Sequence, residues 1–205
     1  MKAKQMVLAF LAAAAMVVNG AIDPSGDTSG ANDAAAIQLA IDSAANGGTV
    51  TLGAGMFYIN EQLYVTNGVT LAGQGWEDTV IKAASGKNIR CVTLKEGAKL
   101  VGVTVTGGKT TSNWQHGSGV LVEDGTVSWC CVSNNTSIGR NIYGVGVSFK
   151  KGSIDHSIVA FNILSVEHHP LSRQIHHSQS HNQGCQVPVL LLGGQGREMD
   201  DPWRW

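Results

Sequence analysis

The chain has 205 residues, a formal net charge of −1, 14% charged residues and 26 glycines. A net charge this close to zero excludes a protein that binds nucleic acid by neutralising many phosphates. The charged fraction is well below the usual share of about a quarter. Few charges and many glycines favour an architecture of stacked, sharply bent backbone over a helical globule.

Residues 1–21 have the order of a secretory signal peptide. Lys2 and Lys4 precede an uninterrupted apolar run over residues 6–18, and small residues follow it. An uncleaved N-terminal anchor is the alternative, but the run is shorter than a typical membrane span. We therefore predict a secreted protein, extracellular or periplasmic, that starts near Ile22 and has no membrane contact after cleavage.

One N-terminal α-helix is predicted within residues 30–48. Asn32 or Asp33 can cap it, the alanines that follow favour it, and two glycines end it. Its predicted apolar side comprises Ile37, Leu39 and Ile41. Because only strand-like segments follow, we expect the helix to cover the open end of a stack of sheets.

The strand-like part of the chain repeats. Residues 119–135 align with residues 146–162 at an offset of 27, and residues 91–108 fit at an offset of 28 before their turn and 27 after it. Glycines, apolar positions and one asparagine recur in step, including Asn135 over Asn162. A repeat of this length with three short strands predicts one coil of a parallel β-helix. The interior column is expected to contain Val92, Val120 and Val147.

A β-sandwich is the alternative fold, since it would use hairpin turns such as Asn-Gly and Asp-Gly. Asn67-Gly68 and Asp124-Gly125 are such pairs. However, the second lies inside the repeat and is replaced one coil later by Lys151-Gly152. The repeat therefore favours the parallel β-helix.

The strings "ANDAAAIQLAIDSA", "GGTVTLGAGMFYI", "NGVTLAGQG" and "TVIKA" resemble the N-terminus of the pectate lyase/pectin lyase superfamily, and the resemblance spans residues 27–165. It implies an all-β fold, a right-handed parallel β-helix of about five coils with an N-terminal capping α-helix, over residues 22–165. It also implies a secreted protein that acts on or binds acidic polysaccharide, with calcium as the expected cofactor in some relatives. The hydrolase strings NTD, GHG and RIK are missing, so the resemblance leaves open whether the chain is a polysaccharide lyase, a glycoside hydrolase or not an enzyme.

The charged residues of successive coils gather at one turn. The repeat stacks Lys95-Glu96-Gly97, Glu123-Asp124-Gly125 and Lys150-Lys151-Gly152 as a column. One interpretation is a catalytic site in which a base lies beside metal-binding carboxylates. Its candidate catalytic residues are Glu123, Asp124, Lys150 and Lys151. Glu123 and Asp124 are also the candidate metal ligands. The other is charge complementarity between exposed turns, where opposite charges attract weakly.

Two segments between coils, residues 107–118 and 136–144, form the predicted substrate-binding surface. Aromatic faces and a guanidinium suit stacking on sugar rings and pairing with uronate carboxylates. The substrate-binding candidates are Trp114, His116, Arg140 and Tyr143.

Two further features have simple interpretations. Cys130 and Cys131 are adjacent, so in a strand they point to opposite faces and one of them is expected in the core. Asp155 and His156 would form a pair only at a turn, with Trp129 one coil before His156, and a solvated polar turn is the expected arrangement.

The repeat ends near residue 165. Residues 166–205 hold five of the seven histidines and are predicted to form an irregular tail without a regular coil. His177 and His181 could bind a metal on one helix face, and a truncated or frame-shifted reading of a longer gene is an alternative explanation of the segment. The chain is then a polysaccharide-cleaving enzyme, a non-catalytic β-helix for adhesion or carbohydrate binding, or an inactive fragment, and in each case we expect a monomer.

Overall fold

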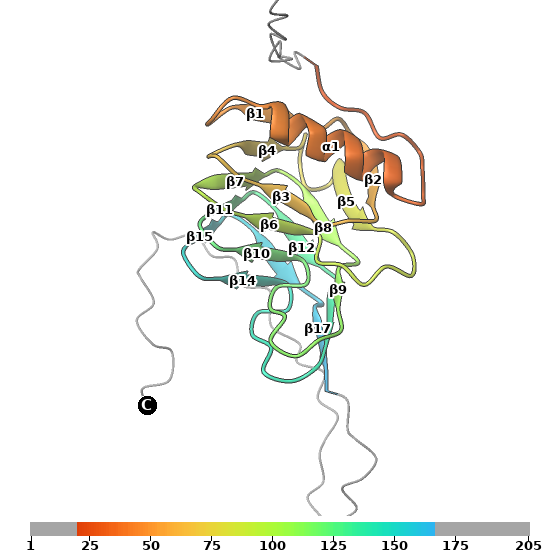
Figure 1. Ribbon diagram of the computed structural model, residues 1–205, viewed down its shortest axis with the longest axis vertical. Helices are drawn as coiled ribbons and strands as arrows, with labels where there is room; N and C mark the ends of the chain where they lie inside the picture. Colours follow the sequence, from red (N-terminus) through yellow and green to blue (C-terminus); the bar gives the residue numbers. More distant parts are fainter. Residues whose placement is uncertain (1–19, 167–205) are drawn as a thin grey trace, which may run out of the picture.

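The computed structural model describes residues 20–166, which form a parallel β-solenoid (Figure 1). The chain makes about four turns, and three strands begin a fifth. Every pairing between the strands is parallel, and each joins equivalent strands of neighbouring coils. The predicted parallel β-helix is confirmed, and the β-sandwich is excluded.

The predicted signal peptide and the His-rich tail lie, apart from residues 20, 21 and 166, outside the described residues. The same holds for His177 and His181. Within residues 20–166, no helix is long and apolar enough to cross a membrane.

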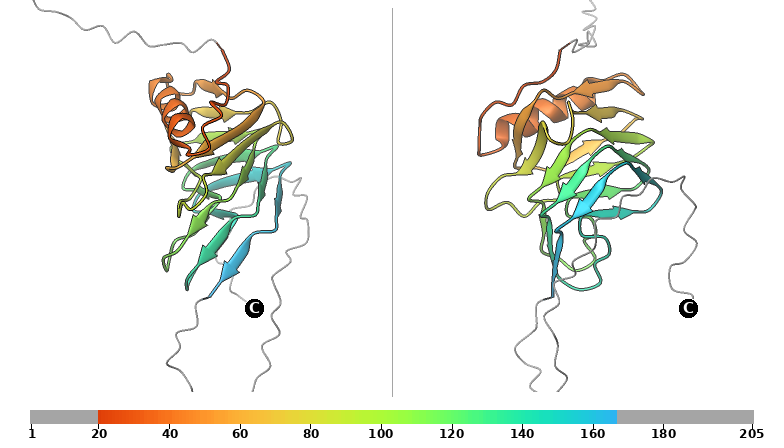
Figure 2. Two further views of the ribbon diagram at one scale, coloured as in Figure 1. Left: turned by 90° about the vertical axis from the view of Figure 1, so that its right-hand side faces the viewer. Right: turned by 180° about the vertical axis from the view of Figure 1, so that it is seen from behind.

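The strands of the described residues form four sheets that run along the stack. Figure 2 shows the stack from two further sides. The first sheet contains β1 (Thr49–Thr51), β4 (Thr70–Ala72), β7 (Ala98–Val101), β11 (Gly125–Ser128) and β15 (Gly152–Asp155). The second contains β2 (Gly55–Ile59), β5 (Thr79–Ala83), β8 (Thr104–Thr106), β12 (Cys131–Ser133) and β16 (Ile158–Ala160). The third contains β9 (Lys109–Thr110), β13 (Thr136–Ile138) and β17 (Ile163–Ser165), and the fourth β3 (Leu63–Val65), β6 (Val92–Leu94), β10 (Val120–Val122) and β14 (Val147–Phe149).

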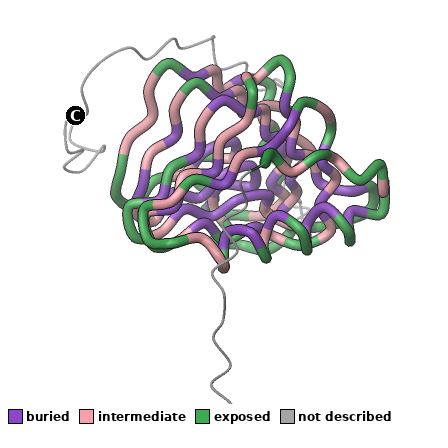
Figure 3. The backbone as a smooth tube through the Cα atoms, turned by 90° about the horizontal axis from the view of Figure 1, so that it is seen from above, coloured by how far each residue is buried: buried purple, intermediate pink, exposed green. Residues whose placement is uncertain are grey.

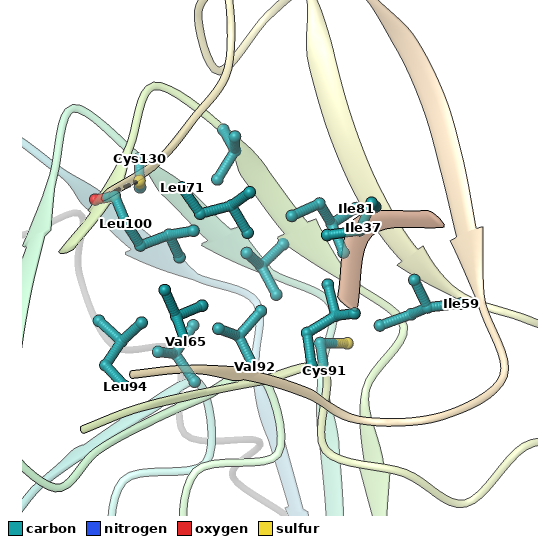
Figure 4. Close-up of a cluster of buried hydrophobic side chains, with 14 of the residues drawn as sticks. Ile37, Ile59, Val65, Leu71, Ile81, Cys91, Val92, Leu94, Leu100 and Cys130 are labelled. Carbon is teal, nitrogen blue, oxygen red and sulfur yellow. Dashed lines mark hydrogen bonds between the residues drawn. The ribbon is translucent and has the colours of Figure 1, made fainter. Parts of the chain in front are cut away.

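The core consists of columns of apolar side chains, one residue per coil. Val120 lies between Val92 and Val147 in the fourth sheet, and all three are buried, as the repeat predicted. Figure 3 shows the buried segments alternating with exposed corners around each coil, and Figure 4 shows Leu71 beside Leu100 in the shared interior. Each such fully buried side chain contributes about 1.5–3 kcal/mol to folding.

The one helix within residues 20–166, α1 (Ala31–Ser43), lies across the end of the stack against the strands of the first coil (Figure 1). Ile37 and Ile41 are buried against the core, whereas Leu39 is exposed. The prediction of Leu39 on the apolar side was wrong because a residue two positions along a helix lies on a nearly opposite face.

The predicted caps of α1 were also wrong. The N-cap is Gly30, and Asn32 and Asp33 lie within the first turn. Asp27, outside the helix, accepts a hydrogen bond from the Asn32 amide of the first turn at 3.1 Å and another from the Ser29 amide, which precedes the helix, at 2.9 Å. The buried Asp33 carboxylate joins the helix to its surroundings instead, accepting from the amides of residues 25 and 58 at 2.8 and 3.0 Å.

The third sheet was not predicted. Each of the two segments expected to be a loop begins with one of its strands, β9 or β13, and β13 pairs with both β9 and β17. The third and fourth coils therefore have four strands each. The sequence gives little sign of these strands, because their buried side chains, Thr110 and Ser137, are polar.

The change of offset in the repeat has a structural cause. Glu96 and Gly97 both have positive φ, 56° and 74°, and lengthen one turn by a residue. As a result Ala98, and not Gly97 as the repeat alignment predicted, lies opposite Gly125.

The cysteines of the described residues are not paired with one another. Cys91 and Cys130 are buried, and burial raises the pKa of each thiol to about 12. Cys131 is partly exposed, so the prediction that one of the adjacent pair lies in the core is confirmed.

Candidate functional site

The binding candidates lie on two loops that stack on each other. We call residues 111–118 and 139–146 the loop ladder. The Arg140 amide donates to Asn113 Oδ1 at 2.7 Å, and the Trp114 amide donates to the Arg140 carbonyl at 3.2 Å. The offset of 27 residues that relates the strands therefore continues through the loops, and it holds the binding candidates in a fixed register.

Glycine is required where the loops return to the fourth sheet. Gly117 donates its amide to the Gly144 carbonyl at 2.8 Å, and both have positive φ, 63° and 60°. A Cβ on Gly117 would lie 2.4 Å from the Val120 carbonyl oxygen. Side chains are excluded from both positions by this close approach.

Buried polar groups anchor the base of the ladder. The Thr110 hydroxyl lies 2.8 Å from that of Ser118 and 3.0 Å from that of Ser137, and the two serine hydroxyls also contact each other. The buried Asn135 side chain accepts from the Gly108 amide at 2.8 Å. Because buried polar groups are costly to leave without partners, this cluster fixes where the loops begin.

Arg90 fixes where the first loop ends. Its Nε donates to the Gly117 carbonyl at 2.9 Å, and its Nη2 donates to the His116 carbonyl at 2.7 Å. Burial lowers the pKa of Arg90, while Tyr64 and Glu123 oppose that change. Arg90 was not predicted as a site residue, because it lies just before the repeat unit and no motif identifies it.

His116 and Tyr143 are in contact. Their ring centroids lie 5.3 Å apart, and the Tyr143 amide donates to His116 Nδ1 at 3.0 Å. The pKa of His116 is lowered by its partial burial and then by the nearby positive charges of Arg90 and Lys150. The imidazole is therefore a neutral acceptor beside two cations at neutral pH.

The ladder presents its remaining candidates to solvent. Trp114 is 64% exposed and Tyr143 55% exposed. Arg140 is also exposed, and its guanidinium makes no hydrogen bond or ion pair with any residue from 20 to 166. All four predicted binding residues thus lie on the ladder, with His116 and Tyr143 in direct contact and Trp114 joined to Arg140 through the backbone.

The catalytic candidates form ion pairs with one another. Glu123 lies 3.7 Å from the Lys95 ammonium and 3.3 Å from that of Lys150, and Asp124 lies 3.0 Å from that of Lys151. The predicted column of charged turns is present in this form. Each carboxylate is neutralised by a lysine, which is the arrangement expected of complementary exposed turns.

Glu123 and Asp124 do not fit a calcium site. Calcium needs six to eight oxygen ligands from several groups, whereas these two carboxylates already face three ammonium groups. In the part of the chain that the structure describes, no group of three or more His, Cys, Asp or Glu side chains could hold a metal ion.

Comparison with known proteins assigns neither a family nor a function to the chain. No family model matches the chain, and no match was found among the curated proteins or the solved structures.

Proposed function

We propose that the chain is a secreted, pectate-lyase-like β-helix protein that binds acidic polysaccharide through the loop ladder and does not cleave it. The observation that carries this proposal is the ladder itself, in which Trp114, Arg140 and Tyr143 are exposed on loops held by backbone hydrogen bonds. A preorganised surface loses less entropy when it binds than a mobile one.

The chemistry of the ladder suits a chain of uronate rings. The exposed aromatic side chains Trp114 and Tyr143 offer apolar surfaces for the C–H faces of sugars. Arg140 offers a planar guanidinium for a carboxylate, and Arg90 and Lys150 add positive charge near His116. The proposed ligand is therefore acidic rather than neutral.

Binding without cleavage is favoured because the catalytic candidates are engaged with one another. Lys150 and Lys151 face Glu123 and Asp124, so neither the lysines nor the carboxylates are poised for a substrate. Assays for reducing ends and for unsaturated products on polygalacturonate, with and without calcium, test this directly. Product formation that requires Lys150 or Glu123 would establish a lyase or hydrolase instead.

Isothermal titration with oligogalacturonate and with dextran tests the binding proposal. We expect Trp114→Ala to weaken binding of the acidic ligand at least fivefold. Arg140→Gln should weaken it about fivefold at low salt, since an exposed charge pair contributes about 1 kcal/mol. Arg140→Gln should have little effect on any dextran binding.

Two matched controls exclude general effects of charge and aromatic loss. Lys99→Gln removes an exposed cation from the first sheet, and Trp129→Ala removes an exposed indole from another corner. Both variants should bind oligogalacturonate as the unmodified protein does. Affinity that survives the Trp114→Ala, Arg140→Gln double change would place the site elsewhere.

A further inference from the structure

A second aromatic surface lies away from the loop ladder, at the corner between the first and second sheets. We call Gly102, Trp129 and His156 the aromatic corner. They occupy equivalent turn positions 27 residues apart: the Gly102 amide donates to the Ser128 carbonyl at 3.2 Å, and the Trp129 amide donates to the Asp155 carbonyl at 3.4 Å. The turn required for Asp155 and His156 to approach each other is therefore present.

The backbone of this corner favours glycine. Gly102, Trp129 and His156 have φ values of 63°, 53° and 41°, in the region that residues with side chains rarely adopt. Trp114 on the loop ladder, with a φ of 65°, shares this property. Gly107, Asn134 and Phe161 repeat this conformation at another corner, so it is a property of the solenoid turns and supports a binding site only together with the stacked rings.

The two rings of the corner form a flat stack. The Trp129 and His156 centroids lie 4.4 Å apart with an interplanar angle of 10°, and Trp129 is 54% exposed. In the preceding coil the equivalent residue is Gly102, which has no side chain to cover the opposite face of the indole. The stack therefore supports the indole from one side and leaves the other available.

The stacked turn carries one acidic side chain, Asp155. Asp155 Oδ1 lies 3.8 Å from His156 Nδ1 and is buried without a hydrogen-bond partner among the described residues, whereas the Asp155 side chain as a whole is 42% exposed. In the register of the first sheet, Asp155 lies opposite Ser128. Neither coil segment that forms the stack, residues 125–133 or 152–160, contains a lysine or an arginine.

We propose that the aromatic corner is a carbohydrate-binding site for a neutral sugar ring. The C–H face of the ring lies on Trp129, whose plane is held by His156, and a ring hydroxyl donates to Asp155 Oδ2, since Oδ1 is buried. A uronate is disfavoured here, because its carboxylate would approach Asp155, and Lys99, the cation in the segment of Gly102, lies two coils away from the strand of Asp155. This site does not depend on the loop ladder, which carries the opposite charge preference.

The test is an NMR titration of the whole chain, following the indole N–H signal of Trp129 and the ring signals of His156. The probes are the neutral hexasaccharides of β-1,4-glucose, β-1,4-mannose and β-1,4-xylose, with trigalacturonate as the acidic probe. We expect at least one neutral probe to cause saturable shifts of both residues, and trigalacturonate to leave them unchanged.

Variants connect these shifts to the site. Trp129→Ala should abolish the binding, Asp155→Asn should weaken it at least threefold, and Trp129→Phe should retain part of it, whereas Trp114→Ala should leave it unchanged. If Trp129→Ala does not fold, Asp155→Asn and Trp129→Phe carry the test. The proposal is overturned if no neutral probe shifts Trp129, if binding persists without the indole, or if trigalacturonate shifts Trp129 as strongly as the neutral probes.

Discussion

The two ends of the solenoid use the same repeat in different surroundings. At the first coil, α1 covers the core, and Ile37, Phe57 and Ile59 are fully buried. At the last coil, the apolar residues of β17 are open, with Ile163 57% and Leu164 46% exposed, and no described residue lies over them. Among the described residues β17 pairs with one neighbouring strand only, β13, so position along the stack affects how much its apolar residues contribute.

The comparison is tested most strongly by truncating one residue at each end. Ile37→Ala should lower the free energy of unfolding by about 2–5 kcal/mol, because it opens a cavity between α1 and the first coil. Leu164→Ala should change it by less than about 0.5 kcal/mol, since the side chain is half exposed. Urea unfolding measures both values.

A matched control exists on the helix itself, because Leu39→Ala removes a similar volume from the exposed side of α1. It should behave like Leu164→Ala. If Leu164→Ala proved as destabilising as Ile37→Ala, the last coil would be covered in solution and the contrast between the ends would be wrong.

The stacked side chains of Asn135 and Asn162 test the same contrast between the interior of the stack and its last coil, with polar groups. Asn135 is buried, and its Nδ2 donates to Asn162 Oδ1 at 2.9 Å and to the Val105 carbonyl at 3.2 Å. Asn135→Ala leaves these groups and the Gly108 amide without their partner. It should therefore lower the free energy of unfolding by about 1–3 kcal/mol. The partly exposed Asn162 is in the last coil, where water can replace lost bonds, so Asn162→Ala should cost less in the same unfolding experiment.

Equal losses in the two asparagine variants would contradict this account. So would a tolerated Asn135→Ala, because it would mean that water reaches the interior of the fourth coil. The predicted stacking of these two residues is confirmed by the hydrogen bond between their side chains.

The ion pairs at the exposed turns should contribute far less to the free energy of unfolding than the buried apolar and polar residues of the core. Glu123→Gln removes pairs with Lys95 and Lys150, and should reduce stability by under about 1 kcal/mol at low salt. The difference should vanish near 1 M salt, where charges are screened within about 3 Å. A larger, salt-independent loss would give Glu123 a role that these ion pairs do not explain.

The smallest expected effect is local to the loop ladder. The pKa of His116 lies below the ordinary 6.5, so the unfolded state binds more protons between the two values. The contribution of the neutral ring to stability is therefore complete above pH 6.5. It is lost as the pH falls from there through the lower pKa of the folded state. An NMR titration should show a pKa below 6.5 with a parallel shift of the Tyr143 amide, whose hydrogen bond to Nδ1 requires the neutral ring. A pKa of 6.5 or above would contradict the assigned surroundings of His116.

The core of this fold was predictable because its signal is periodic. Apolar residues recur at a spacing of 27, so Val120 over Val147 follows from alignment alone. The third sheet escaped prediction, because Thr110 and Ser137 are buried through hydrogen bonds with each other, and hydrophobic pattern does not detect such pairs. Thr93 is likewise a buried polar residue in a strand, with its hydroxyl accepting from Gln62 at 2.6 Å.

The candidate sites were predictable only where the repeat extends into them. Tyr143 lies over His116 because the loops keep the offset of the strands. Arg90 was missed, because its role depends on carbonyl groups that the sequence does not reveal. The pairing of Trp129 with His156 was expected from the offset, but the flat stack depends on a backbone conformation that favours glycine.

The central claim is that acidic sugar binds the loop ladder, and mapping trigalacturonate onto the assigned amide and indole signals tests it most directly. The account predicts saturable shifts at Trp114, His116, Arg140 and Tyr143, with the signals of Glu123 and Lys150 changing less. Shifts centred on Glu123, Asp124 and Lys151, or no shifts on the ladder at saturating ligand, would contradict it.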